Sequence, residues 1–398
     1  MCRQYYGERN ENMDTFELDS KYVAGTYKRF PVEIVSGKGS VLTDSDGKNY
    51  IDLGAGIAVN TFGAGDKDFK EAVTEQLDMI QHTSNLYYSR PCTELAKILC
   101  ERTGMKKVFF NNSGAEANEC AIKAGRKYGT DRRGEDCYTI ITLRNSFHGR
   151  TITTLSATGQ DKFHELFRPM TPGFVHVTPG DFEEFKSVCE NNKIAAFMFE
   201  CVQGEGGVVP VDADYIKKAA EYCKQKDILL MVDEVQTGNG RTGKLYSYMN
   251  FDIEPDVVTT AKGLAGGLPI GACLLGSKVE NIFGYGDNGS TFGGNPVSCA
   301  AAVSIINRID DRLLDGVIRK GRIVREALKN APGIESVTGL GLMLGIKTVK
   351  PASEVISKCI EKGVLCLSAK DKVRLLPALN IPDDLLRDAV EIIKQCSI

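Results

Sequence analysis

Between about residues 65 and 305, stretches with a helical spacing of apolar residues alternate with short runs that are apolar throughout. Over 66–80, for example, Phe69, Val73 and Leu77 recur on one helical face. We predict helices over 66–80, 114–128, 182–191 and 215–226, and strands over 107–110, 138–143, 194–201, 228–233, 256–261 and 272–275. Because continuously apolar strands are buried on both faces, the pattern predicts an α/β fold with a mainly parallel sheet covered by helices.

Both ends of the chain differ from this central region. Roughly the first 60 residues alternate turn signals with short apolar stretches, which predicts a hairpin or a small sheet. After the central region we predict helices over 296–309, 313–330 and 383–394, and strands over 339–346 and 373–376. We therefore expect a large domain over 65–305 and a smaller α/β domain built from residues 1–64 and 306–398.

The charge balance and the cysteines argue against several classes of protein. The net charge is −3, so no strong basic field exists to bind nucleic acid or anionic lipid. No apolar run approaches the ~20 residues of a membrane-spanning helix, and the N-terminus lacks an apolar signal segment. The 13 cysteines form no C-x-x-C pair, which favours a reducing cytoplasm and argues against a metal site.

Polar residues just beyond the carboxyl ends of the predicted strands are the first candidates for a ligand site, because open parallel sheets bind ligands there. After the strand at 107–110, Ser113, Gly114 and Ala115 lead into a helix. Gly114 and Ala115 have almost no side chain, so an anion can approach their backbone N–H groups at the positive end of the helix dipole. The segment is either a phosphate site or, more simply, a helix start that Ser113 caps with nothing bound.

Two further candidates end apolar strands. Asp233 and Glu234 follow the strand at 228–233, where a carboxylate needs a partner because burying an unpaired charge costs several kcal/mol. That partner is a metal, an arginine or a protonated ring nitrogen, and a structural ion pair is the alternative. Lys262 ends the next apolar run, before a glycine-rich loop. A desolvated lysine is the usual Schiff-base nucleophile, and a lysine that extends into solvent is the alternative.

The three candidates together fit one cofactor, pyridoxal 5'-phosphate. Gly114 and Ala115 match its phosphate, Asp233 matches its ring nitrogen, and the amine of Lys262 matches its aldehyde. A charged ring nitrogen makes the ring an electron sink for the negative charge at the substrate carbon. The lysine amine can then carry the proton that leaves this carbon. We therefore assign Lys262 and Asp233 as the catalytic residues.

From about Tyr22 to Leu376, the sequence resembles the class III pyridoxal-phosphate-dependent aminotransferases of fold type I. The motifs that carry the resemblance stand in matching order: HTSNLYY (82–88), SGAEANE (113–119), FHGRT (147–151), QGEGG (203–207), DEVQTGNGRTG (233–243), AKG (261–263) and STFGGNP (290–296). The resemblance implies a seven-stranded, mainly parallel sheet in the large domain. It also implies a homodimer with shared active sites.

The resemblance further implies roles for the residues that match the family's motifs. The cofactor residues are Ser113, Gly114 and Ala115 at the phosphate, Phe147 and Val235 on the two ring faces, Gln236 at the ring oxygen, Asp233, Lys262, and Thr291, which reaches the neighbouring subunit's cofactor. The substrate residues are Arg150 and Arg374, which bind carboxylates, Glu205, which pairs with Arg374 until glutamate binds, and Ser290, which contacts the amino donor. His148 is expected to pack or to form a hydrogen bond.

Within the family, the resemblance is strongest to members that act on N2-acetylornithine, with 2-oxoglutarate and glutamate as the second pair of substrates. Ornithine-specific members have a tyrosine and a tryptophan where this chain has Gly56 and His148, and the small Gly56 leaves room for an N-acyl group. The expected reaction is a ping-pong transfer that gives N-acetylglutamate 5-semialdehyde, in the biosynthesis of arginine. Succinylornithine, succinyl-diaminopimelate, ornithine and 4-aminobutyrate are the alternative donors.

Other classes of function stay open on the residues alone. A racemase, mutase or decarboxylase of the same fold would share the cofactor residues but would not need Arg374 and a switchable Glu205. A non-catalytic binding protein would be expected to lose Lys262 or Asp233. A nicotinamide-dinucleotide site has the least support, because no G-x-G-x-x-G stands at a strand–helix turn.

Overall fold

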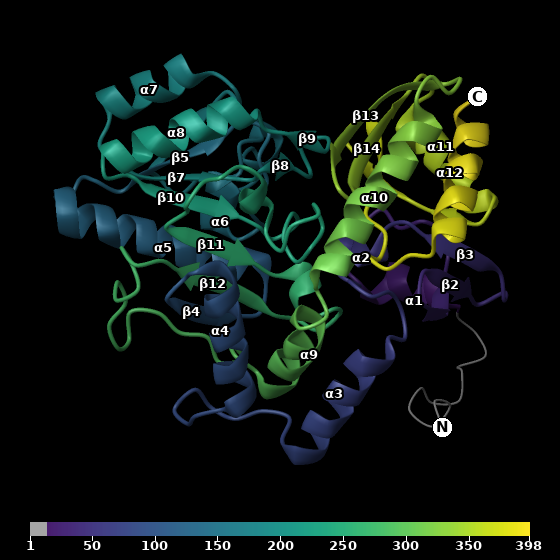
Figure 1. Cartoon of the computed structure of the whole chain (residues 1–398), viewed down its shortest axis with the longest axis horizontal. Helices are drawn as coiled ribbons and strands as arrows, with labels where there is room; N and C mark the ends of the chain where they lie inside the picture. The colour runs from purple at the N-terminus through teal and green to yellow at the C-terminus, as the bar shows by residue number, and fades with distance from the viewer. Residues whose placement is uncertain (1–13) are drawn as a thin grey trace.

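Figure 1 shows the computed structural model, which describes residues 14–398. Residues 1–13, which include Cys2 and the start of the predicted N-terminal segment, lie outside the described residues. A larger part with a central sheet and a smaller part that carries the C-terminal helices lie side by side. In the part of the chain that the structure describes, no helix is long and apolar enough to cross a membrane.

The larger part is built on a seven-stranded sheet with the order β4-β12-β11-β10-β7-β5-β6. Its strands are β4 (Lys107–Asn111), β5 (Thr139–Leu143), β6 (Phe174–Val177), β7 (Ile194–Phe199), β10 (Leu229–Asp233), β11 (Val257–Thr260) and β12 (Gly271–Leu275). β12 runs antiparallel to both of its neighbours, and every other pair is parallel. The predicted fold class is therefore confirmed.

Helices cover both faces of this sheet. On one face, α5 (Gly114–Arg133) and the short α6 (Ile152–Ala157) lie over a core that includes Ile122, Ile140 and Met198. The other face is covered by α4 (Arg90–Thr103), α7 (Phe182–Asn191), α8 (Ala213–Gln225) and α9 (Pro296–Ile306). Because both faces bury apolar side chains, β7 and β10 are buried at every position.

Helix α9 is apolar around most of its circumference, and it packs between α4 and α3 (Lys67–Met79). It ends at Ile306, three residues before the predicted end. The guanidinium of Arg102 donates to the carbonyl oxygens of Ile306 and Ile309, at 2.6 Å each. These bonds fix the end of the helix and the turn that follows it.

The smaller part combines segments from both ends of the chain. β1 (Ile34–Lys38), β2 (Val41–Asp44) and β3 (Asn49–Asp52) form one sheet with β15 (Val364–Leu365), which runs parallel to β3. A second sheet has the order β13 (Ile334–Leu340), β14 (Met343–Thr348), β17 (Lys372–Leu375) and β16 (Leu367–Ala369). α10 (Asp311–Leu328), α11 (Ala352–Glu361) and α12 (Asp383–Ser397) share a core with Leu53 from the N-terminal segment.

Several predicted elements differ from the observed ones. The strand predicted over 339–346 is the hairpin β13–β14, which turns at Gly341 (φ 53°) and Leu342. Leu342 is fully buried, so the turn reads as part of an apolar run. The helix predicted to end at residue 128 continues to Arg133 through Gly129, where a Cβ would lie 2.2 Å from the carbonyl oxygen of Cys137. The sequence patterns did not predict α4, β6 or α11.

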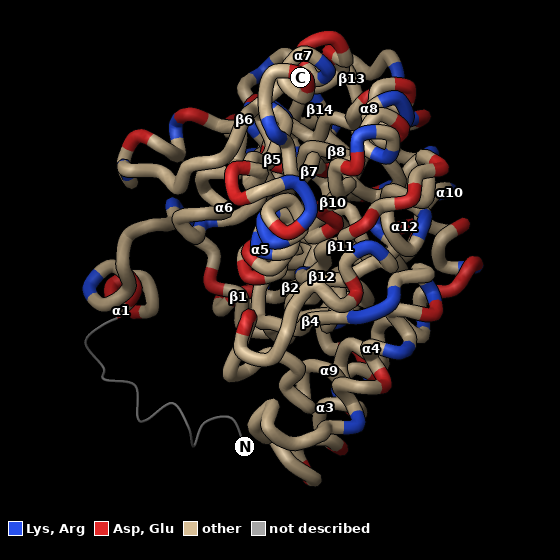
Figure 2. Tube along the Cα trace, turned by 90° about the vertical axis from the view of Figure 1, so that its left-hand side faces the viewer, with Lys and Arg blue, Asp and Glu red and all other residues tan. Residues whose placement is uncertain are grey.

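Two short helices and two short strands remain to be described. α1 (Thr15–Tyr22) has no buried residue, and Figure 2 shows it standing away from the body of the molecule. α2 (Ala55–Ala58) is a single turn, and β8 (Val202–Gln203) pairs with β9 (Val209–Pro210) near the large sheet. Figure 2 also shows that acidic and basic residues are interspersed along the described chain, in keeping with the small net charge.

Candidate active site

A cavity of about 560 Å³ lies beyond the carboxyl ends of β4, β5, β7, β10 and β11, the edge of the sheet where parallel strands bind ligands. All three segments singled out from the sequence meet there. The polar residues that line the cavity are Tyr27, Asn112, Ser113, Asn118, His148, Arg150, Glu200, Asp233, Gln236 and Lys262. Gly114, Ala115, Phe147 and Val235 also line it.

The N-terminus of α5 forms the anion site of the cavity. The Ser113 side chain accepts from the backbone N–H of Glu116 at 3.2 Å, and the Glu116 carboxylate accepts from the N–H of Asn112 at 3.1 Å. These bonds fix the loop, while helix geometry leaves the first N–H groups, those of Gly114 and Ala115, without intrahelical partners. A Cβ on Gly114 would lie 2.5 Å from Cγ1 of Val235. Only glycine therefore keeps both the cradle and the contact with Val235.

Asp233 ends β10 and is buried beneath the cavity. Its Oδ2 accepts from Nδ2 of Asn118 and lies next to Nδ1 of His148, both at 2.8 Å. Its Oδ1 accepts the backbone N–H of Val235 at 3.0 Å. These three groups fix the carboxylate and leave an Oδ1 lone pair, so the residue can accept from a protonated ring nitrogen.

His148 is fully buried behind Asp233. Burial lowers the pKa of His148, but its hydrogen bond to Asp233 and the negative charges of Asp233 and Glu200 outweigh that effect and raise the pKa. A protonated His148 donates from Nδ1 to Oδ2 of Asp233. Its Nε2 has no hydrogen-bond partner among residues 14–398. The expected hydrogen-bonding role of His148 thus has a specific partner, Asp233.

Glu200 links two loops of the site. Its carboxylate accepts the backbone N–H of Phe147 at 2.9 Å and that of Gly204 at 3.3 Å. Burial raises its pKa to about 7. Because these bonds are to backbone groups, Glu200 holds the Phe147 loop in place and is not free to bind a ligand.

Lys262 follows β11, with its amine in the cavity and a left-handed backbone (φ 42°) that non-glycine residues seldom adopt. The next residue, Gly263, helps to hold this conformation. Its carbonyl oxygen accepts a hydrogen bond from Oγ1 of Thr61 at 2.7 Å, and a Cβ on Gly263 would lie only 2.9 Å from that Oγ1. Burial lowers the pKa of Lys262, although the charges of Asp233 and Glu205 oppose that shift. The amine is therefore less basic than an exposed lysine.

Glu205 and Arg374 form an ion pair beside Gln236. Arg374 Nη1 also donates to Oε1 of Gln236 at 3.3 Å. Burial raises the pKa of Glu205, but the charge and hydrogen bond of Arg374 outweigh it and lower the pKa overall. A Cβ on Gly204 would lie 2.3 Å from Oε1 of Gln236, so the glycine lets the loop close on that side chain.

Not every predicted site residue lies in the cavity. Ser290 reaches its rim, where Oγ accepts from Nδ2 of Asn112 at 3.2 Å, but Thr291 is exposed and does not line the cavity. Gly56 is exposed on α2, and its neighbour Val59 lines the cavity. The sequence reasoning did not find Tyr27 or Asn118. Asn118 lies one helical turn after Gly114, and this spacing could have indicated that its side chain is on the same helical face as the cradle.

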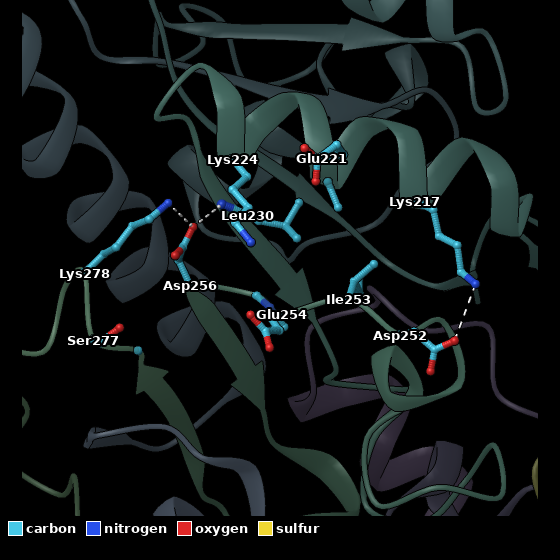
Figure 3. A pocket seen from close by; sticks show the side chains of 13 residues that line it. Lys217, Glu221, Lys224, Leu230, Asp252, Ile253, Glu254, Asp256, Ser277 and Lys278 are labelled. Atoms are coloured by element: carbon cyan, nitrogen blue, oxygen red, sulfur yellow. Dashed lines mark hydrogen bonds and ion pairs between the residues drawn. The ribbon is translucent and has the colours of Figure 1, made fainter.

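A second, larger cavity of about 670 Å³ lies at the opposite edge of the sheet (Figure 3). Two ion pairs occupy it: Lys217 pairs with Asp252 and Lys278 with Asp256, both at 3.4 Å. Asp256 also accepts the backbone N–H of Leu230 at 2.9 Å. Its remaining lysine, Lys224, is exposed, and no start of a helix lines this cavity, so the residues that fit the cofactor are those of the first cavity.

The first cavity fits pyridoxal phosphate on its own geometry. It offers a helix start for a dianion, a fixed carboxylate for a ring nitrogen and a desolvated amine for an aldehyde. Phe147 offers a flat aromatic surface and Val235 an apolar one, against which the ring of the cofactor could pack. In residues 14–398, no group of three metal-ligating side chains is placed to hold a metal ion.

Comparisons with known proteins agree with this geometry. The family model described as aminotransferase class-III matches residues 22–397. The acetylornithine aminotransferase of Haemophilus ducreyi is 49% identical over 381 residues, which are 95% of this chain and 97% of that protein. The acetylornithine aminotransferase of Methanocaldococcus jannaschii is 44% identical over 371 residues (92% and 93%).

Two solved structures are similar over nearly the whole chain. The ornithine aminotransferase of Toxoplasma gondii superposes with a TM-score of 0.92 at 32% identity, over 97% of this chain and 96% of that chain. The N-acetylornithine aminotransferase of Stenotrophomonas maltophilia superposes with a TM-score of 0.83 at 34% identity, over 95% and 97%.

Proposed function

The chain belongs to the class III aminotransferases, which use pyridoxal phosphate, and on that premise we propose that its amino donor is N2-acetyl-L-ornithine and its acceptor 2-oxoglutarate. The products are N-acetyl-L-glutamate 5-semialdehyde and L-glutamate, in the biosynthesis of arginine. The names of relatives at 40–49% identity support this choice of substrate. The observation that carries it is the small Gly56 on the short turn that leads to the cavity-lining Val59, together with Arg150 in the cavity and Arg374 beside the cavity-lining Gln236.

The bound cofactor supplies an electron sink for the negative charge that develops at the substrate carbon. We assign Gly114 and Ala115 to its phosphate, Asp233 to its ring nitrogen, and Lys262 to the covalent bond. Phe147 and Val235 hold the two ring faces, and Gln236 the ring oxygen. Because burial lowers the pKa of Lys262, its amine loses its proton more readily than that of an exposed lysine, which suits a group that takes a proton from the substrate carbon.

A ping-pong transaminase must accept two substrates in one site, and the pair Glu205–Arg374 supports this. While the pair is closed, it presents little net charge, which suits an acylated donor that carries one carboxylate for Arg150. When glutamate binds, its second carboxylate takes the place of Glu205 at Arg374. A decarboxylase or racemase has no need of such an exchange.

We propose a homodimer in which each site needs both chains. Leu86, Tyr87, Tyr88 and Phe292, here called the apolar surface, are exposed, and Tyr88 is fully so. The two segments touch, since Nδ2 of Asn85 donates to the carbonyl oxygens of Ser290 and Gly293 at 2.9 Å. An exposed apolar area of this kind marks an interface. Thr291 lies within it, which supports its assignment to the neighbouring subunit's cofactor.

We also place the protein in the cytoplasm. Twelve described cysteines are all free thiols, in keeping with a reducing compartment.

A panel of amino donors with 2-oxoglutarate tests the substrate assignment: acetylornithine, ornithine, succinylornithine, succinyl-diaminopimelate and 4-aminobutyrate. The expected result is the highest kcat/KM for acetylornithine. Ornithine is the main competitor, because a solved ornithine aminotransferase superposes with a TM-score of 0.92. Equal rates on ornithine and its acetyl form would contradict the role given to Gly56.

A further inference from the structure

Arg150 lines the active-site cavity, and aromatic rings hold it there. Its guanidinium makes no ion pair or hydrogen bond with any residue in 14–398. Its Cζ lies 4.2 Å from the ring centroid of Phe163 and 5.4 Å from that of Phe147. Phe163 is half-buried and ends a short 3₁₀ turn, 161–163, that does not itself line the cavity.

We infer that Phe163 is a positioning residue that holds Arg150 ready for a substrate carboxylate. This inference rests on the proposed function, in which Arg150 binds the carboxylate of N2-acetylornithine. A guanidinium over an aromatic face is attracted through its flat surface, so its N–H edges stay free. An acidic neighbour would also fix Arg150, but it would occupy those donors and cancel the charge that the substrate needs.

Phe163 also supports the residue assigned to a cofactor face. The rings of Phe163 and Phe147 meet edge to face, with centroids 6.0 Å apart and planes at 73°. This is a favoured aromatic arrangement. One side chain thus sets the position of both the carboxylate-binding arginine and the ring-stacking phenylalanine.

The backbone around Phe163 is anchored on both sides. Before it, Nε2 of Gln160 donates to the carbonyl oxygen of Ser146 at 3.0 Å, one residue from Phe147. After it, Nε2 of His164 lies 2.9 and 2.8 Å from the carbonyl oxygens of Leu155 and Thr158. Only a protonated nitrogen satisfies two carbonyl acceptors, so His164 donates from Nε2. Such anchoring is what a fixed platform requires.

A binding measurement on the holoenzyme tests the inference without chemistry. The probe is N2-acetyl-L-norvaline, which keeps the carboxylate of acetylornithine but lacks the reacting amine. Phe163→Leu keeps apolar bulk and removes the aromatic face, so we expect the Kd to rise about 3- to 30-fold. Phe163→Tyr restores the face and should bind like the wild type. Phe167→Leu, a change of an exposed ring in the same segment, is the matched control and should change nothing.

Kinetics with two donors separate positioning from a general structural role. N-acetylputrescine is acetylornithine without its carboxylate. Phe163→Leu should raise the KM for acetylornithine about 3- to 30-fold, with kcat within about threefold, and leave kcat/KM for N-acetylputrescine unchanged. Equal losses on both donors, or an unchanged Kd for the probe, would overturn the inference.

Failure of the proposed function gives a different pattern. If the wild type does not turn over acetylornithine, the substrate assignment is wrong, and glutamate tests Phe163 on the same proteins. Glutamate presents one carboxylate to Arg374 and the other to Arg150, so the concentration that half-converts the cofactor absorption should rise in Phe163→Leu and not in Phe167→Leu. No rise there would reject the role of Phe163.

Discussion

Glu234 is fully buried one residue after Asp233, yet its environment is different. Its carboxylate accepts the backbone N–H of Tyr248 at 2.7 Å and the hydroxyl of Thr237 at 2.5 Å. Burial raises its pKa to about 7. The structure thus ties Glu234 to the backbone that follows β10, in agreement with the structural role expected from the sequence.

The raised pKa of Glu234 predicts how stability changes with pH. The folded state holds this proton up to about pH 7, whereas the unfolded chain releases it near the ordinary value of 4.5. Stability therefore falls as pH rises from 4.5 to 7, by up to about 3 kcal/mol for this group. Glu234→Gln cannot ionise, so its Tm relative to the wild type should increase from pH 5 to 7.5 and then level off.

The control for this measurement is Glu183→Gln, a change of an exposed glutamate on α7. A plot of its Tm against pH should run parallel to that of the wild type. If the plot for Glu234→Gln also ran parallel to it, Glu234 would already be ionised in the folded protein over this pH range.

Replacing one lysine in each cavity tests which cavity holds the cofactor. Lys262→Ala removes the amine assigned to the cofactor and to proton transfer, so turnover should fall by about 10²- to 10⁴-fold or more. Lys278→Ala, in the cavity of Figure 3, should leave turnover unchanged. Borohydride reduction followed by peptide mass spectrometry should find the cofactor on Lys262 in the wild type and in Lys278→Ala. An adduct on another lysine would reject the assignment.

At the scale of elements, α2 is a left-handed turn. Ala55, Gly56, Ile57 and Ala58 all have φ between 44° and 66°. Such a backbone costs about 1–2 kcal/mol per non-glycine residue, so the surroundings must hold it. Oδ1 of Asp52 does so at the start of the turn, where it accepts the N–H groups of Gly54 and Ala55 at 2.8 and 2.9 Å.

This geometry permits a controlled test of the acyl pocket. Gly56→Ala adds the strain of a Cβ at positive φ but little bulk, since its nearest neighbour, Cβ of Val59, would lie at 3.5 Å. Gly56→Tyr adds the same strain and a large ring. We expect Gly56→Tyr to lose about 10- to 200-fold in kcat/KM for acetylornithine relative to Gly56→Ala, with a smaller loss for ornithine. Equal losses on both donors would show that the pocket lies elsewhere.

The elements also show what the sequence could reveal. Most strands and helices around the large sheet, though not α4 and β6, were predictable because each is marked by its own local pattern, as are the cradle, Asp233 and Lys262. The hairpin β13–β14 was not, because a buried Leu342 masks its turn. Tyr27 was missed for a different reason. It reaches the cavity from an extended N-terminal segment with no periodic pattern, through contacts distant in sequence.

At the scale of the whole molecule, the two ends of the chain meet in one sheet. Val364 and Leu365 of β15 pair with Ile51 and Asp52 of β3. Arg374 of β17 crosses in the other direction, from the smaller part to Glu205 and the active site. The ion pair that we propose to open for glutamate is therefore also a contact between the two parts. The division at residues 64 and 305 stays a prediction.

The assembly of the molecule gives the last prediction, which concerns Thr291. If Thr291 completes the neighbour's site, a Lys262→Ala chain and a Thr291→Ala chain in one dimer create one site with both side chains intact. Thr291→Ala alone should retain less cofactor in limiting pyridoxal phosphate, and Lys262→Ala alone should be inactive. Unfolding and refolding the two variants together should then restore activity that neither recovers alone. If Thr291 served its own chain, the mixed dimer would have no intact site and the mixture would stay as inactive as its parts.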